Sequence, residues 1–150
     1  MPSEDELWEL VAGRREGVLA TVAPSGRPQL SNVLYVADRT TRLVRISTTA
    51  DRAKARNVAR DARASLHVSG EDFWHFAVAD GTATLSKVAA QPDDEAVQEL
   101  AEVHSSFYGA LDHDQFPAEM IAARRVVIRL QVDHLYGVMS SSGRRPAARG

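Results

Sequence analysis

Residues 47–57 bring together the kinds of group that bind a phosphate dianion. The segment reads Ser-Thr-Thr-Ala-Asp-Arg-Ala-Lys-Ala-Arg-Asn, so hydroxyl side chains come first and basic side chains follow. Asp51 is a good N-cap, and no Gly or Pro interrupts residues 52–60, which predicts a short helix there. Basic side chains are locally unfavourable at the positive end of a helix. Free N–H groups, hydroxyls and cations at one point are what a phosphate requires.

The same segment also fits a solvated basic helix face. Arg52, Arg56, Arg60 and Arg63 recur at a spacing near that of a helical surface stripe. Short charge patterns are weak signals on their own, so both interpretations stay open at this point.

Two further groups of residues offer contacts to a ring. Gln29, Ser31 and Asn32 place amide and hydroxyl groups in a predicted strand, where they could bond the edge of a polar heterocycle. The solvent side of an alternating strand explains them equally well. Trp74 and Phe76, two residues apart, predict two aromatic rings on one strand face. Such a pair is usually core or dimer interface, and stacking on a ring cofactor is the alternative.

The strands that carry the candidate phosphate-binding and ring-binding residues are predicted to form an antiparallel meander. Short β-branched runs separated by turn residues predict six or so strands, at 18–22, 29–36, 43–48, 64–68, 73–85 and 125–132. Gly81 predicts a bulge or bend, which a sheet needs in order to curl into a barrel. Further helices are expected at 3–15, which Ser3 and Glu6 open as a capping box, and at 92–107, with His104 on its inner face. One or two helical turns are expected at 117–123. The predicted fold is mainly β (α+β), a small antiparallel barrel with peripheral helices.

Composition narrows the function classes. The chain has 150 residues, 44% of them hydrophobic, with a net charge of -2 and no cysteine. Disulfides, thiolate catalysis and cysteine-ligated metal sites are therefore excluded. The acidic balance argues against nucleic acid, no apolar run could span a bilayer, and the N-terminus lacks a signal-peptide pattern, so we expect a cytoplasmic protein that binds no membrane. A metal site built from His104, Asp112 and His113 is not expected, because their spacing matches no ligand pattern.

Blocks along the chain resemble a known family. Gly-Val-Leu-Ala-Thr at 17–21, Gly-Arg-Pro-Gln-Leu-Ser-Asn-Val at 26–33 and Arg-Ala-Lys-Ala-Arg-Asn-Val at 52–58 come first, and 79–83 and 124–137 follow. In this order they are similar to the pyridoxamine 5'-phosphate oxidase-like split-barrel flavoproteins. Within that group the chain most resembles the actinobacterial class that uses the deazaflavin coenzyme F-420. The similarity predicts one domain over 1–150, with a helical N-terminus at 3–15, a barrel at 17–137 and a flexible tail at 138–150.

The resemblance implies a homodimer of FMN-binding split barrels, with two cofactor sites at the subunit interface. It implies that Arg52 and Lys54 hold the cofactor phosphate with help from hydroxyls, that the second strand faces the ring, and that the aromatic pair comes from the other subunit. The candidate cofactor-binding residues are Gln29, Ser31, Asn32, Ser47, Thr48, Arg52, Ala53, Lys54, Arg56, Asn57, Trp74 and Phe76.

In the expected activity, the cofactor ring carries out the chemistry and no catalytic side chain is required. The sequence shows no nucleophile or paired carboxylates, and in flavin and deazaflavin enzymes the protein mainly binds, orients and shields the ring. We expect an F-420-dependent reductase, rather than an oxidase, that transfers hydride from the reduced cofactor to an unsaturated small molecule. The alternatives are an FMN-dependent enzyme of the same family and a non-catalytic carrier of F-420 or flavin. The substrate-binding His and Arg residues of true pyridoxamine 5'-phosphate oxidases are not recognisable, which argues against vitamin B6 chemistry.

Overall fold

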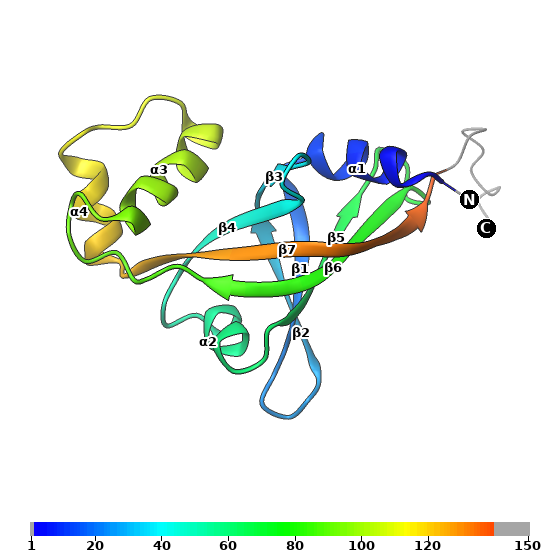
Figure 1. The fold of residues 1–150 in the computed structure, drawn as a ribbon, viewed down its shortest axis with the longest axis horizontal. Helices are drawn as coiled ribbons and strands as arrows, with labels where there is room; N and C mark the ends of the chain where they lie inside the picture. The colour runs from blue at the N-terminus through cyan, green and yellow to red at the C-terminus, as the bar shows by residue number, and fades with distance from the viewer. Residues whose placement is uncertain (1, 140–150) are drawn as a thin grey trace, which may run out of the picture.

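The computed structural model describes residues 2–139 and shows a single curled antiparallel sheet (Figure 1). Within these residues the strand order is β2-β1-β5-β6-β7-β4-β3, and every neighbouring pair is antiparallel. The strands are β1 (Glu16–Val22), β2 (Pro28–Leu34), β3 (Val36–Asp38), β4 (Leu43–Thr49), β5 (Arg63–Ser69), β6 (Phe76–Leu85) and β7 (Arg125–Val138). This arrangement confirms the predicted mainly β, antiparallel barrel architecture.

Four helices lie around the sheet in the described part of the chain. In Figure 1, α3 and α4 lie at one end of the long β6–β7 pair, α1 lies at the other end, and α2 follows β4. Their bounds are α1 (Glu4–Ala12), α2 (Ala53–Arg60), α3 (Glu95–Tyr108) and α4 (Gln115–Ala122). None of these helices combines the length and the apolar character needed to cross a membrane.

Three strand boundaries differ from the predicted ones. The predicted strand at 29–36 is two strands, because the chain pairs with β1 up to Leu34 and with β4 from Val36 onward. The strand predicted from residue 73 begins at Phe76 instead. The last strand does not end at 132 but continues to Val138, because it pairs with the whole of β6. Exposed polar residues in its second half hid this extension from the apolar pattern.

The predicted bend at Gly81 is confirmed. The β6–β7 register shifts between Asp80 and Gly81, and a Cβ atom at Gly81 would lie 2.0 Å from Gln131 O. The partner strand therefore approaches closer than any side chain at this position would permit. The bulge lets two long strands curl together and cross the sheet as one pair.

The core fills the concave side of the sheet, with a smaller cluster under the helices at one end. Leu19, Ile46, Leu66 and Leu130 are at most 1% exposed and belong to the main cluster, which α1 covers. The second cluster lies beneath α3 and α4, and it consists of Ala89, Val97, Leu100, Phe116, Met120 and Val127. This second cluster seats α3 beside the end of the sheet where β4 and α2 meet.

Helix ends depart from the predicted ranges by a few residues. Ser3 caps α1 by accepting a bond from Glu6 N at 3.1 Å, as expected from the Ser-to-Glu spacing, but the helix ends at Ala12 rather than 15. Asp94 caps α3, so this helix begins at Glu95 and not at 92. The helical turns expected at 117–123 form α4, which begins at Gln115. Of the predicted flexible tail at 138–150, residues 140–150 lie outside the described residues.

Candidate functional site

A cleft of about 380 Å³ lies between β2, β4, the start of α2 and the C-terminal half of α3. Five side chains form its polar end, and we call them the phosphate cradle: Ser47, Thr48, Arg52, Lys54 and Arg125. β4 supplies the hydroxyls, the start of α2 supplies Arg52 and Lys54, and Arg125 is the first residue of β7. Among the described residues that line this cleft, none is Asp or Glu.

The other end of the cleft is apolar and aromatic. Val33 and Leu34 come from β2, and Val103, Phe107 and Tyr108 come from α3. Tyr108 is 67% exposed, so its ring reaches the rim rather than the core. A cleft with charge at one end and rings at the other is suited to a ligand that carries an anion on a flat, apolar body.

The cradle begins where α2 begins, and the predicted N-cap is wrong. Arg52 occupies the cap position without a side-chain cap bond, and the helix runs from Ala53. The Asp51 carboxylate instead accepts a bond from Thr49 Oγ1 at 2.6 Å, and this hydroxyl is the main reason that the pKa of Asp51 lies below its ordinary value. The first N–H groups of α2 therefore have no side-chain cap from the residue that precedes the helix, which suits an anion at this point.

The positive charges of the cradle repel one another when no anion is present. Burial, and then the neighbouring Arg52 and Arg125, lowers the pKa of Lys54. Among the described residues, Arg125 Nε is a buried atom that has no hydrogen-bond partner. Unpaired buried donors are rare in folded proteins, and several cations without a carboxylate repel one another. A bound phosphate would satisfy both deficits, so the residues present fit the phosphate of a flavin or deazaflavin.

Five of the candidate residues from the sequence lie together on this cleft: Asn32, Ser47, Thr48, Arg52 and Lys54. The remaining seven do not line it. They are Gln29, Ser31, Ala53, Arg56, Asn57, Trp74 and Phe76.

Asn57 and Gln29 take part in a polar network behind α2. Asn57 is 2% exposed, and its Nδ2 donates to Thr21 Oγ1 at 3.0 Å and to Gln29 Oε1 at 2.7 Å. Arg60 Nη2 donates to Asn57 Oδ1 at 3.0 Å and to Val22 O at 2.6 Å. This network fastens α2 to β1 and β2, and so it holds the first turn of α2 at the cleft.

The aromatic pair is not a pair on one strand face. Trp74 lies in the turn before β6 and packs edge-on against Phe73, with ring centroids 4.9 Å apart. Phe76, the first residue of β6, stacks on His67 at 5.4 Å. The expectation that Trp74 and Phe76 share a strand is wrong because the strand starts later than its aromatic pattern suggests.

Two of the cleft residues that were not predicted from the sequence contact Ser47 directly. His104 Nε2 lies 2.9 Å from Ser47 Oγ, and Arg125 Nη1 donates to the same oxygen at 3.3 Å. The sequence pattern assigned His104 to the inner face of its helix and gave Arg125 no role. Nothing local in the sequence indicates that α3 lies against β4, because the two residues of that contact are 57 positions apart.

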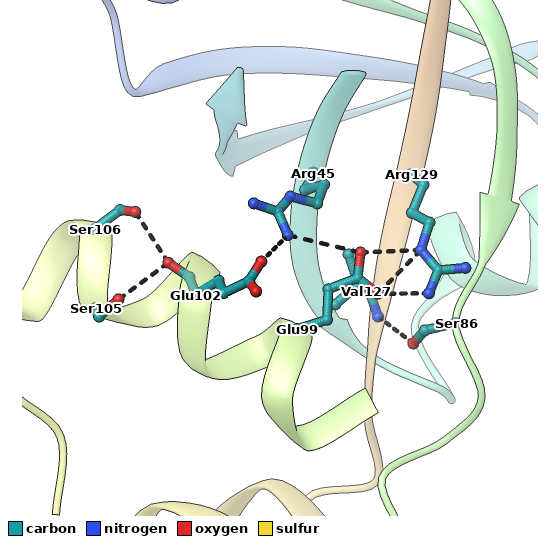
Figure 2. Close-up of polar contacts among 8 residues, drawn as sticks. All are labelled: Arg45, Ser86, Glu99, Glu102, Ser105, Ser106, Val127 and Arg129. Atoms are coloured by element: carbon teal, nitrogen blue, oxygen red, sulfur yellow. Dashed lines mark hydrogen bonds and ion pairs between the residues drawn. The ribbon is translucent and has the colours of Figure 1, made fainter. Parts of the chain in front are cut away.

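Two arginines on the sheet hold α3 in place. Figure 2 shows Arg129 of β7 reaching Glu99, and its Nε lies 3.0 and 2.9 Å from the two carboxylate oxygens. Arg45 of β4 reaches Glu102 at 2.5 Å and lies 3.9 Å from Glu99. Because Arg129 grips both oxygens of Glu99, this contact fixes direction as well as distance. The anchored turn of α3 is the one that precedes His104.

Comparison with known proteins decides the family. A family model described as pyridoxamine 5'-phosphate oxidase matches residues 3–139. The chain belongs to this family. The match confirms the resemblance found in the sequence, and with the curled antiparallel sheet it identifies the fold as a split barrel.

Solved structures share this fold at low sequence identity. A structure described as F420 reductase is 20% identical, with a TM-score of 0.69 over 91% of this chain and 98% of that chain. A conserved hypothetical protein from Mycobacterium tuberculosis is 22% identical, with a TM-score of 0.67 over 95% of this chain and 94% of that one. The heme storage protein HutZ from Vibrio cholerae is 19% identical, with a TM-score of 0.62 over 91% and 95%. Proteins whose descriptions name different ligands, F420 in one and heme in another, thus share this fold.

Proposed function

We propose that the protein is a flavin- or deazaflavin-dependent oxidoreductase that anchors its cofactor phosphate in the cradle, with coenzyme F-420 preferred to FMN. The observation that carries the proposal is the gathering of Arg52, Lys54 and Arg125 around hydroxyls in a cleft whose described lining includes no carboxylate. Each charged hydrogen bond to the anion would contribute about 1.5–3 kcal/mol. Three or four such bonds give an anchor of roughly micromolar strength.

The reduced ring of the cofactor would supply the hydride, and the protein would supply the surroundings. The cradle binds the phosphate, the hydroxyls of Ser47 and Thr48 orient it, and Phe107 and Tyr108 limit the access of water at the other end. An unsaturated small molecule is the proposed hydride acceptor, because a flat acceptor can stack against the ring. Among the described residues that line the cleft, none is a carboxylate that would repel the cofactor phosphate.

The preference for F-420 rests on one nearby cation. F-420 carries an anionic glutamyl tail that FMN lacks, and Arg56, Arg60 and Arg63 are the basic residues that follow the cradle. Arg60 is bonded to Asn57 and Val22, and Arg63 is paired with Asp61 at 2.7 Å. Arg56 is exposed on the first turns of α2 and is the free partner for such a tail.

A second copy of the chain is the proposed partner. β2 is an edge strand of the sheet, and it exposes Leu30 and Leu34 at 65% and 43%. Leu34 also lines the cleft, so a partner packed on β2 would cover the cofactor as well as the strand. A hydrophobic strand left open at a sheet edge is a pairing surface.

Titration of the purified protein with FMN and with F-420, followed by absorbance and fluorescence, tests the proposal. Replacing Arg52 and Lys54 together by Ala should weaken cofactor binding by a hundredfold or more, about 3 kcal/mol or above. The matched control is Arg63→Ala with Lys87→Ala, which removes one arginine and the other lysine outside the cleft. Equal affinity of both double variants would contradict the phosphate anchor.

Turnover separates an enzyme from a carrier. The reduced cofactor should be consumed when enones or quinones are added to the complex. Tight binding without consumption by any acceptor would replace the enzyme by a cofactor carrier. Binding of heme, with neither FMN nor F-420 bound, would contradict both.

A further inference from the structure

His104 is the one titratable side chain that α3 places against a hydroxyl of the phosphate cradle. Its Nε2 lies 2.9 Å from Ser47 Oγ, and its ring packs edge-on against Phe116 of α4, with centroids 5.3 Å apart. The ring is half-buried. The position is therefore fixed from two sides, by a polar contact at Nε2 and by an aromatic contact on the ring.

The Ser47 hydroxyl has one hydrogen to give, and its neighbours decide where that hydrogen points. Arg125 can only donate, so the 3.3 Å contact uses one lone pair of Ser47 Oγ. If His104 is neutral with its proton on Nδ1, Nε2 is bare, and Ser47 donates its hydrogen to the ring and has none for a ligand. If Nε2 carries a proton, the ring donates to the second lone pair, and the Ser47 hydrogen turns into the cleft toward an anion.

The charged groups around the His104 imidazole determine its protonation state when no ligand is bound. The charged and titratable side chains that line the cleft with His104 are Arg52, Lys54, Tyr108 and Arg125. β4 contributes the Ser47 hydroxyl, and the part of α4 against the ring is Phe116, which is uncharged. Burial and then Arg125 hold the pKa of His104 below its ordinary value. Burial and the neighbouring cations thus disfavour the charged ring in the unliganded protein, whereas a dianion in the cradle would favour it.

We propose that His104 is a positioning residue for the phosphate anchor: in the unliganded protein its bare Nε2 accepts from Ser47, and when the anion binds it takes up a proton there and thereby turns the Ser47 O–H toward the anion. This inference rests on the proposed function, because it assumes that the cradle holds a phosphate. The proton comes from solvent and forms an N–H bond at Nε2 of the ring, and no other covalent bond of the protein or the ligand is made or broken. The affinity for an anion that does not itself titrate then falls as pH rises from the pKa of His104 in the free protein to its higher pKa in the complex.

Nuclear magnetic resonance of the imidazole groups tests the inference on the unaltered protein. Inorganic sulfate serves as a probe that stays a dianion throughout, and FMN serves as the phosphate-bearing probe. Binding of either should raise the pKa of His104 by about one unit or more. The His104→Gln variant assigns the signal among the five histidines, and His113, which lies outside the cleft, is the internal control.

The outcomes separate the inference from the function on which it rests. Binding of FMN or sulfate with an unchanged or lowered pKa of His104 would overturn the inference and leave the phosphate anchor intact. Failure of FMN, F-420 and sulfate to bind at all would overturn both. A rise in the pKa of His104 equal to that of His113 would also overturn it, since a remote histidine reports only bulk ionic effects.

Variants isolate the role of the hydroxyl. His104→Gln keeps a side-chain amide donor, so the affinity for sulfate, which stays a dianion, should lose its dependence on pH between about 5.5 and 8, the range in which histidine titrates. His104→Leu removes the donor and should weaken binding about tenfold. In Ser47→Ala the pH dependence should shrink, because no hydroxyl remains to be turned. An undiminished pH dependence in Ser47→Ala would overturn the role assigned to Ser47.

Discussion

Asn57 Nδ2 lies 2.7 Å from Gln29 Oε1, so a buried amide of α2 is joined directly to the edge strand β2. The same Nδ2 also bonds Thr21 of β1. The first turn of α2, which carries the cationic part of the cradle, therefore has a fixed distance from both strands. The hydrogen bond between the Asn57 and Gln29 side chains therefore helps to hold both the sheet edge and the start of α2 at the cleft in place.

Asn57→Ala should lower the free energy of unfolding by about 1–3 kcal/mol, because it leaves the buried hydroxyl of Thr21 without this partner and removes the Arg60 contact as well. Urea unfolding followed by circular dichroism measures the change. Arg56→Ala is the neighbouring control, and as an exposed site it should stay within about 0.5 kcal/mol of the wild type. A loss in Asn57→Ala no larger than in Arg56→Ala would contradict a structural role for the amide.

The sequence was sufficient for the sheet and for part of the cleft. Alternation of apolar residues is local information, so the strands and the bend at Gly81 could be predicted from it. The run of hydroxyls and cations from Ser47 to Lys54 could be predicted too, because a strand end and a helix start adjoin in sequence. Side-chain direction is less local. Asn57 was expected at the cofactor, yet it points into the network behind α2.

The rest of the cleft depends on contacts between distant segments. Arg125 reaches Ser47 only because β7 pairs with β4, in a register that sets Thr49 beside Arg125. His104 reaches Ser47 only because α3 packs on the end of that strand pair. Neither pairing leaves a periodic signal near the residues concerned. The helical pattern at 92–107 fixed which face of α3 turns inward but not what that face meets.

Lys54 should make the unliganded protein less stable at neutral pH than a variant without the charge. Its pKa is lower in the folded protein than the ordinary 10.5, so the unfolded chain holds the proton more tightly. Stability should therefore rise with pH from the folded pKa up to about 10.5. Lys54→Met should remove that rise and increase thermal stability at pH 7, while Lys87→Met should keep the wild-type pH profile. A pH profile of Lys54→Met that matches the wild type would contradict this.

The same Lys54→Met variant shows whether the charge that lowers stability also contributes to cofactor affinity. Lys54→Met should weaken FMN or F-420 binding by about 10–100-fold, the equivalent of one charged hydrogen bond. Loss of affinity together with a gain in melting temperature is the expected pair of results. A variant that loses both would indicate that Lys54 supports the fold rather than the ligand.

Leu30→Asp should convert a dimer to a monomer. Leu30 is 65% exposed on the edge strand but does not line the cleft, so the change leaves the cradle untouched. Each buried leucine contributes about 1.5–3 kcal/mol, and a symmetric interface contains two copies, so the dissociation constant should rise by about a hundredfold or more. Sedimentation equilibrium measures it. Ala118→Asp on α4 is the control, and a monomeric wild type or a dimeric Leu30→Asp would contradict the proposed interface.

Glu99→Ala should loosen α3 and weaken cofactor binding without touching the cleft. Glu99 is the partner of Arg129 and lies near Arg45, so its loss leaves Arg129 without the carboxylate that fixes α3 to β7. The expected loss of stability is about 1–3 kcal/mol, and affinity should fall because His104 is held one turn further along the same helix. Glu102→Ala, whose carboxylate is 64% exposed, should cost less than about 1 kcal/mol. Urea unfolding and FMN titration of the two variants decide the matter, and equal effects would show that Arg129 does not position α3.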